Sequence, residues 1–238
     1  MSIGLLLCDH LDPDVAEVVG DYTELFPAAF GPAGIDLRVY DVTAGQFPAT
    51  TDECDGWVIS GSRRSVYEDE GWIRDLHDVA HELVTRERPV AGICFGHQLI
   101  ARTLGGTVER AEVGWGVGVR EFRVVAPGPT MDPDTMSFSI LTSHRDQVLV
   151  LPEGAQLVAT AEYCPVGAYR IGEHVLCVQG HPEWVPALSR LLIGRRREQI
   201  GDDTSDAALA SLEQPLDHGR VVSWMAGVLR PGSRPAGR

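Results

Sequence analysis

The first half of the chain alternates short apolar runs rich in β-branched residues with stretches of helical periodicity. The runs that predict strands are residues 3–8, 35–42, 56–60 and 89–93. The clearest helix is expected over residues 72–86, because apolar residues recur there at three- and four-residue spacing and form one stripe opposite a charged face. Strands that alternate with helices are typical of a parallel sheet.

The pattern changes at residue 107. Strand-like segments then follow one another, broken by Pro and Gly, at residues 117–125, 138–141, 147–150, 156–160 and 174–178. Helical patterns resume at 186–200 and, interrupted near Pro215, at 206–229. The sequence therefore predicts an α/β fold with a mostly parallel central sheet and a mixed or antiparallel extension. We expect one domain over residues 1–230 and a mobile C-terminal tail at 231–238.

The composition fits an ordinary globular domain. Of the 238 residues, 44% are hydrophobic, which is enough to form a buried core, and 23% are charged. The net charge of −14 argues against a nucleic-acid partner, because binding phosphates requires a basic face. All 20 cationic residues are arginine, so the chain has no lysine for a P-loop, for a kinase ATP site or for a Schiff base.

The N-terminal segment and the cysteines indicate the cellular compartment and the chemistry of the thiols. Residues 1–8 lack the basic start and the cleavage site of a signal peptide, and no apolar run approaches ~18 residues. We therefore expect a cytoplasmic protein with no membrane partner. The five cysteines are irregularly spaced and contain no C-x-x-C pair, which predicts neither a disulfide framework nor a thiolate zinc site. One of them is free to serve as a nucleophile.

The strongest local motif is Gly92-Ile93-Cys94-Phe95-Gly96-His97-Gln98, which follows an apolar run and opens a helical pattern. It has the G-x-nucleophile-x-G form of a nucleophile elbow. Both glycines are needed because a Cβ at either position would collide with the neighbouring backbone. The amino terminus of the helix favours the thiolate of Cys94 through its unpaired N–H groups and positive dipole end. A lone cysteine is more often a small buried hydrophobe, but the two glycines favour a nucleophile.

A thiolate nucleophile needs a group that can both accept and return a proton, and histidine suits both steps. His181 follows the apolar run that ends at Val178, so it should lie at a strand end, where parallel strands present catalytic groups. Glu183 is two residues further on. In an extended chain its carboxylate points to the same side and can accept the imidazole N–H. Alone, this segment would be read as a loop histidine with a solvated glutamate, and the elbow favours a catalytic pair instead.

The elbow with Gln98 and the later segment His181-Pro182-Glu183 resemble the class I glutamine amidotransferase family. Further similar segments are Ile59-Ser60-Gly61 leading into Ser65-Val66-Tyr67, Gly105-Gly106, Gly114-Trp115 after Glu112, and Ser143-His144 with Asp146. In particular, the chain resembles stand-alone proteins related to the amidotransferase domain of GMP synthase. The resemblance implies a flavodoxin-like three-layer fold. It also implies a Cys-His-Glu triad that hydrolyses the side-chain amide of glutamine through a γ-glutamyl thioester.

Carried over residue by residue, the resemblance implies Cys94 as the nucleophile, His181 as the acid and base, and Glu183 as the orienting carboxylate. The N–H of Phe95 is implied as one oxyanion donor, and the second is expected in the region of Gly61 and Ser62. The implied substrate contacts are Gln98, Ser143, His144 and Arg145.

Two positions depart from the family pattern, and both add an arginine. The usual Gly-Gly-Pro is replaced by Gly61-Ser62-Arg63, which puts the conformation of the oxyanion loop in question, and Arg145 stands where relatives often carry glycine. A guanidinium that enters the pocket would pair with a substrate carboxylate and favour substrates with an additional acid group. The ordinary expectation is that both arginines point to solvent.

Three other patterns have simpler explanations. Ser143, His144 and Asp146 are the residue types of a serine triad, but residues so close in sequence rarely converge on one relay. His77 and His81 have zinc-like spacing, yet no third ligand is evident and a solvated helix face is expected. The run at 195–197 could dock an acidic partner, although the helix dipole alone favours arginines at a helix carboxyl end.

The sequence therefore predicts a cysteine-dependent amidase that hydrolyses a γ-glutamyl amide such as glutamine, with no metal or cofactor. No synthetase domain is evident, so the protein either passes ammonia to a separate synthetase partner or hydrolyses a γ-glutamyl compound in its own right, and the sequence does not decide between them. The alternative is a γ-glutamyl peptidase that acts on another γ-glutamyl small molecule. An alternative of another class is a catalytically silent binding or regulatory module, in which the altered loop at 61–63 leaves the oxyanion hole unformed.

Overall fold

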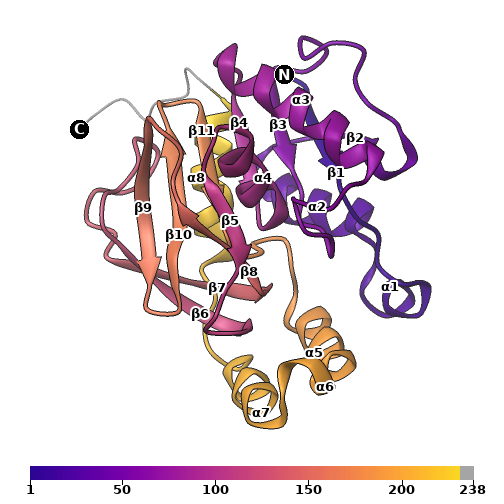
Figure 1. The fold of residues 1–238 in the computed structure, drawn as a ribbon, viewed down its shortest axis with the longest axis vertical. Helices are drawn as coiled ribbons and strands as arrows, with labels where there is room; N and C mark the ends of the chain where they lie inside the picture. Colours follow the sequence, from indigo (N-terminus) through magenta and orange to yellow (C-terminus); the bar gives the residue numbers. More distant parts are fainter. Residues whose placement is uncertain (231–238) are drawn as a thin grey trace.

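A nine-stranded sheet runs through the centre of the protein (Figure 1). The structure is a computed structural model, and it describes residues 1–230. The predicted tail at 231–238 lies outside the described residues. Five neighbouring strands pair in parallel. In order across the sheet they are β2 (Leu37–Asp41), β1 (Ile3–Leu7), β3 (Gly56–Ile59), β4 (Val90–Ile93) and β11 (Val175–Val178).

Four antiparallel strands extend the sheet beyond β11. They are β10 (Cys164–Ile171), β9 (Ala155–Ala161), β6 (Gly116–Val124) and β7 (Ser137–His144). A separate antiparallel pair is formed by β5 (Thr107–Arg110) and β8 (Asp146–Val150). The predicted combination of a mostly parallel centre with an antiparallel extension is confirmed.

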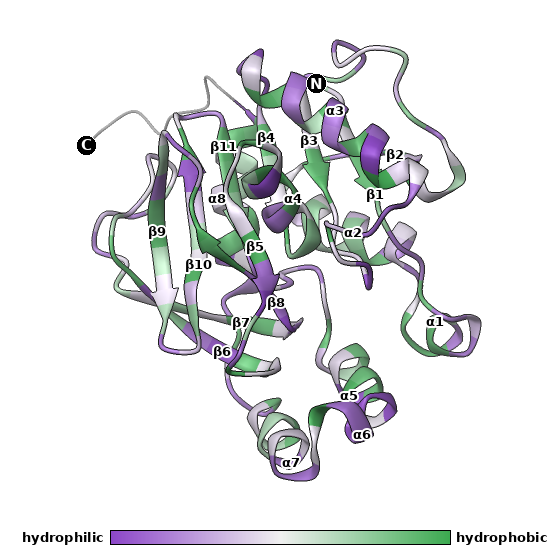
Figure 2. Ribbon diagram, viewed as in Figure 1, coloured by the Kyte–Doolittle hydropathy of each residue, from purple (hydrophilic) through white to green (hydrophobic). Residues whose placement is uncertain are grey.

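Helices cover both faces of the parallel strands and give the fold its three layers. One face packs on α2 (Tyr22–Phe30) and α8 (His218–Leu229), and the other on α3 (Gly71–Thr85) and α4 (Phe95–Thr103). The predicted apolar stripe of α3 faces inward, with Ile73, Leu76 and Leu83 buried. Figure 2 shows the hydrophobic colouring concentrated on the central strands and hydrophilic stretches along α3. Burial of apolar surface on both sides of the sheet holds the layers together.

The remaining helices lie at the edge that carries the carboxyl ends of the parallel strands. Below that edge, α5 (Pro186–Arg195), α6 (Arg197–Ile200) and α7 (Asp202–Ser211) form a projecting arm, and α1 (Pro13–Val19) lies beside it (Figure 1). The helix predicted over 186–200 is split at Arg196, whose backbone leaves the helical region (φ −100°, ψ 9°). Two short 3₁₀ turns complete the elements, η1 (Gly31–Ala33) and η2 (Val42–Ala44).

Strand β10 is absent from the sequence-based prediction because Pro165 and Gly167 interrupt its pattern. Gly167 has a packing role, since a Cβ there would overlap the ring of Phe122. A glycine that indicates a break by composition can therefore mark a close approach between strands. Within residues 1–230, none of the helices has the length and apolar character needed to span a membrane.

Candidate active site

Cys94 occupies the sharp turn between β4 and α4. Its backbone has a positive φ (φ 49°, ψ −98°), an uncommon conformation for a residue with a side chain. A Cβ at Gly92 would lie 3.0 Å from the carbonyl of Gly96, and one at Gly96 would overlap the carbonyl oxygen of Ile59. The steric role predicted for the two glycines is therefore confirmed.

Backbone hydrogen bonds fix this elbow to the strand on each side. The Cys94 N–H donates to the Val178 carbonyl at the end of β11 (2.9 Å), and the Gly96 N–H donates to the Ser60 carbonyl after β3 (3.1 Å). Because β3, β4 and β11 are parallel neighbours, their carboxyl ends meet at one edge of the sheet. The sheet order thus brings the segments at 60–62 and 179–183 to the elbow.

His181 and Glu183 form a buried pair beside Cys94. Nδ1 of His181 lies 2.8 Å from Oε1 of Glu183, and the His181 backbone N–H donates to the Leu141 carbonyl (2.8 Å). The ring stacks on Trp184 with centroids 3.9 Å apart. Burial opposes a positive charge on the ring, but the neighbouring charges of Cys94 and Glu183 outweigh it and raise the pKa of His181 to about 10. The three predicted triad residues therefore lie together.

Gln179 is a site residue that the sequence analysis missed. Its Nε2 lies 3.6 Å from Sγ of Cys94, and its Oε1 accepts a hydrogen bond from Nε2 of Gln98 (3.0 Å). Gln98 also donates to the Asp146 carbonyl (2.8 Å). The amide nitrogen of Gln98 thus donates both of its hydrogen bonds within the protein. Gln179 stands two residues before His181, a spacing that places both side chains on one side of an extended chain.

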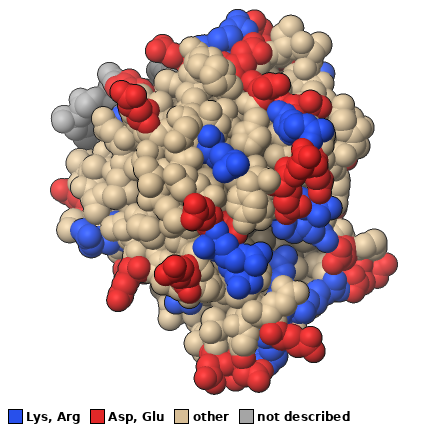
Figure 3. Space-filling view, viewed as in Figure 1, with Lys and Arg blue, Asp and Glu red and all other residues tan. Residues whose placement is uncertain are grey.

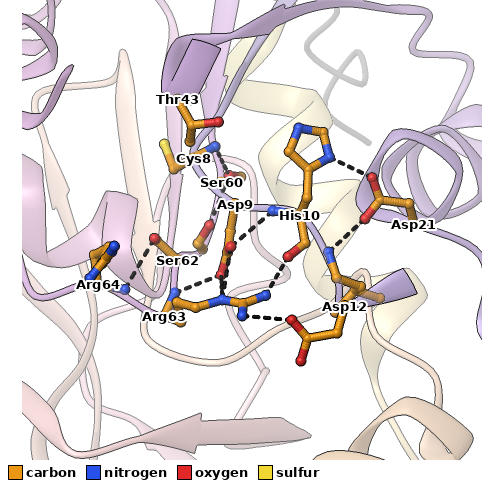
Figure 4. Close-up of polar contacts among 12 residues, drawn as sticks. Cys8, Asp9, His10, Asp12, Asp21, Thr43, Ser60, Ser62, Arg63 and Arg64 are labelled. Atoms are coloured by element: carbon orange, nitrogen blue, oxygen red, sulfur yellow. Dashed lines mark hydrogen bonds and ion pairs between the residues drawn. The ribbon is translucent and has the colours of Figure 1, made fainter. Parts of the chain in front are cut away.

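Arg63 ties the loop after β3 to the segment after β1 (Figure 4). The backbone N–H of Arg63 donates to Asp9 (2.8 Å), Nε donates to the same carboxylate (3.0 Å), and Nη1 donates to Asp12 (2.9 Å). Nη2 donates to the carbonyl of His10. Every nitrogen of the guanidinium is therefore used by the segment after β1, so Arg63 neither points freely to solvent nor offers a fork to a substrate.

The predicted oxyanion groups belong to two elements, the start of α4 and the loop after β3. Phe95 is the first residue of α4, where a backbone N–H has no partner within the helix. Gly61 lies beside the elbow, since a Cβ on Gly61 would be 3.6 Å from Cβ of Cys94. Ser62 is fixed by the Arg64 N–H, which donates to its Oγ (3.2 Å).

The turn between β7 and β8 carries the other predicted contacts. Ser143 Oγ accepts a hydrogen bond from Nη1 of Arg196 (3.0 Å), and Nδ1 of His144 contacts the backbone carbonyl of Asp146 (3.2 Å) rather than its carboxylate. The Asp146 carboxylate accepts from Ser65 instead. Burial lowers the pKa of His144 to about 3, so its ring is neutral. No Ser-His-Asp relay forms within this turn.

A cavity of about 540 Å³ opens above Cys94. Its lining includes the predicted residues Ser62, Cys94, Gln98, Ser143, His144, Arg145 and His181. Cys94 is 5% exposed. Burial raises the pKa of Cys8, Cys164 and Cys177 to about 12, which keeps these three as thiols. Among the five cysteines, Cys94 is the one that lines this cavity.

One histidine of the pair on α3, His77, has a structural role. His77 is half-buried, and its ring contacts Oγ1 of Thr103 (2.6 Å) and the carbonyl of Val66 (3.1 Å), so it joins α3 to α4. His81 is exposed, as expected for a solvated face. Over residues 1–230, no three His, Cys, Asp or Glu side chains gather in a way that could hold a metal ion.

Comparison of the sequence with known proteins gives matches over most of the chain. The family model described as "Glutamine amidotransferase class-I" matches residues 15–193. Gamma-glutamyl peptidase 2 of Arabidopsis thaliana is 38% identical over 176 residues, which cover 71% of this chain and 71% of that protein. The glutamine-hydrolyzing GMP synthase of Clostridium novyi is 38% identical over 159 residues, which cover 66% of this chain and 30% of that enzyme.

The fold has a counterpart among solved structures. The crystal structure of a glutamine amidotransferase from Thermotoga maritima matches with a TM-score of 0.73 at 18% identity, over 95% of this chain and 96% of that one. It agrees with the flavodoxin-like architecture expected from the resemblance. Since the family model also spans most of the sequence, the chain belongs to the class I glutamine amidotransferase family.

Proposed function

We propose that this protein hydrolyses γ-glutamyl amide bonds through a covalent thioester on Cys94. The observation that carries the proposal is the arrangement at the end of β4. A strained Cys94 at the start of α4 faces a cavity, His181 lies beside it, and Glu183 holds Nδ1 of the ring at 2.8 Å. A nucleophile, a base and a group that orients the base are the elements of covalent acyl transfer.

In the first half of the reaction, the Cys94 thiolate attacks the side-chain carbonyl carbon of the γ-glutamyl group. The N–H groups of Phe95 and of the loop at Gly61 and Ser62 stabilise the oxyanion that forms. When the C–N bond breaks, Nε2 of His181 gives its proton to the leaving nitrogen. Forming the thioester removes the thiolate charge that raises the pKa of His181, so the proton becomes easier to transfer at this stage.

In the second half, water attacks the thioester carbon and His181 accepts its proton. The C–S bond breaks, which releases glutamate and returns Cys94 to the thiolate. Glu183 holds Nδ1 through both halves, so Nε2 always faces the sulfur. Its charge also stabilises the imidazolium.

The hydrolysis has two candidate leaving groups. An amine from a γ-glutamyl amino acid or peptide is favoured by the likeness to a γ-glutamyl peptidase over 71% of both chains and by the room above Cys94. Ammonia from glutamine, passed to a separate synthetase, is the second candidate. It is supported by the likeness to a GMP synthase, of which the matched segment is 30%.

The test is to incubate the purified chain with glutamine and with a panel of γ-glutamyl amino acids, and to measure release of ammonia or amine. We expect turnover by the wild type and none by Cys94→Ala with an unchanged melting temperature. If the wild type releases neither product from any compound in the panel, the protein is instead a silent binding or regulatory module.

A further inference from the structure

Six arginines line the cavity above Cys94, although the chain has 34 carboxylates against 20 arginines. Figure 3 shows basic side chains gathered around a hollow beside the α5–α7 arm. Three of the six make ion pairs on the cavity rim. Arg63 pairs with Asp9 and Asp12, Arg64 with Glu68 and Glu70, and Arg195 with Asp12 and Asp14.

The other three, Arg110, Arg145 and Arg196, have no carboxylate partner among residues 1–230. Nε of Arg145 is buried and makes no hydrogen bond within the described part of the chain. Arg196 donates from Nη1 to Ser143 Oγ (3.0 Å), and its guanidinium carbon lies 5.9 Å from the centroid of the Trp115 ring. Arg110 is exposed at the end of β5. An unpartnered buried guanidinium N–H costs free energy unless a ligand satisfies it.

The carboxylates that line the cavity do not pair with these three arginines. Asp9 and Asp12 hold Arg63, and Glu68 accepts from Arg64 and from the Ser65 N–H. The carboxylate of Asp146 accepts the Ser65 hydroxyl. Within residues 1–230, Arg110, Arg145 and Arg196 therefore remain without an ion-pair partner, and guanidinium groups in that state are open to a charge-assisted hydrogen bond with an anion.

The chemistry of a γ-glutamyl compound indicates which anion fits. Its α-carbon carries an ammonium group and a carboxylate together, so that end has no net charge and gains less from unpaired arginines than a lone carboxylate does. A leaving amino acid differs, because its amine is acylated and its own carboxylate is the only charge near the scissile bond. Glutamine, whose leaving group is ammonia, has no such carboxylate.

We infer that Arg145 and Arg196, with Arg110 at the mouth of the cavity, form a subsite for the carboxylate of the leaving group. The substrate class is then a γ-glutamyl amino acid or peptide with a free carboxylate on the acylated residue. This inference rests on the proposed hydrolysis of γ-glutamyl amides. It makes Arg145 and Arg196 specificity residues that do not take part in bond breaking.

The test compares two compounds that differ in one group, γ-glutamyl-alanine and γ-glutamyl-alaninamide. We expect the wild type to prefer the acid by about tenfold or more in kcat/KM, as charge-assisted hydrogen bonds allow. Arg145→Gln and Arg196→Gln should each bring the ratio of the two kcat/KM values toward one. Arg123→Gln is the matched control, because it removes the same charge from an exposed position on β6 outside this cavity.

A binding measurement separates the subsite from catalysis. Calorimetric titration of Cys94→Ala should show the acid bound about tenfold or more tighter than the amide. Equal affinity for the two compounds would overturn the subsite. Equal losses for acid, amide and glutamine in the arginine variants would also overturn it, because the arginines would then hold the α-carboxylate. If the wild type hydrolyses nothing while Cys94→Ala still prefers the acid, the proposed function fails and the subsite stands.

Discussion

Gly61 lies against the edge of the His181 ring. A Cβ built on Gly61 would lie 2.6 Å from Cε1 of His181 and 3.6 Å from Cβ of Cys94. Its backbone is outside the left-handed region, so the site needs glycine here for space rather than for conformation. The oxyanion loop, the base and the nucleophile are thus packed too closely to admit one more methyl group.

We predict that Gly61→Ala lowers kcat by at least about tenfold, because the His181 ring is stacked on Trp184 and bonded to Glu183 and must be displaced from Cys94. Steady-state kinetics on a γ-glutamyl amide measure the effect. Gly194→Ala in α5 is the control, since nothing lies within 4 Å of its Cβ position. Full activity in Gly61→Ala would contradict this packing.

Arg63→Ala should lower kcat/KM several-fold for every substrate by the same factor. The side chain ties the oxyanion loop to Asp9 and Asp12, so its loss loosens the donor near Gly61 without removing a substrate contact. The measurement is the ratio of kcat/KM for glutamine and for γ-glutamyl amino acids. Arg74→Ala, which breaks an exposed ion pair with Asp69, is the control. A changed ratio in Arg63→Ala would show that this arginine reads the substrate.

The raised pKa of His181 predicts a pH dependence with a definite sign. A ring with a pKa of about 10 stays protonated at neutral pH, so its ion pairs stabilise the folded site below about pH 6.5 and this contribution is lost as the pH rises through about 10. Glu183→Gln removes one of the charges that raise the pKa. We expect the alkaline limb of the kcat/KM profile to move to lower pH by about one unit.

Glu82→Gln on α3 is the control for this profile, because it removes a carboxylate far from the elbow. An alkaline limb that stays in place in Glu183→Gln would mean that the carboxylate does not govern the proton on His181.

Substitutions of His181 and of Glu183 should also lower kcat to different extents. His181→Ala removes the group that moves the proton, and we expect kcat to fall by about a thousandfold or more. Glu183→Gln keeps the ring and loses its charged anchor, so the loss should be smaller. Equal kcat values for wild type and His181→Ala on the same γ-glutamyl amide would exclude the histidine as acid and base.

The elbow could be predicted from the sequence because its constraints are local. A strand, a turn and a helix in succession require Gly92 and Gly96, and a separation of two residues keeps Glu183 beside His181. The link between His181 and Glu183 is a turn closed by the Trp184 N–H, not the extended chain that the sequence predicts. The alternation of elements along the chain was enough to give the parallel centre of the sheet.

The contacts that could not be predicted join segments distant in sequence. Arg63 meets Asp9 only because β1 and β3 are neighbours, and Gln179 reaches Cys94 only because β11 lies next to β4. Strand order is not encoded in local periodicity. Arg196 was part of a basic run in the sequence, and its separate role depends on the break between α5 and α6, which turns it toward Ser143.

The most direct test of the account is to trap the γ-glutamyl thioester. The wild type is mixed with a γ-glutamyl amide, quenched in acid during turnover, digested and analysed by mass spectrometry. We expect one γ-glutamyl group on the peptide that contains Cys94 and none in Cys94→Ala. An adduct on Cys8, Cys54, Cys164 or Cys177, or undiminished hydrolysis by Cys94→Ala, would contradict it.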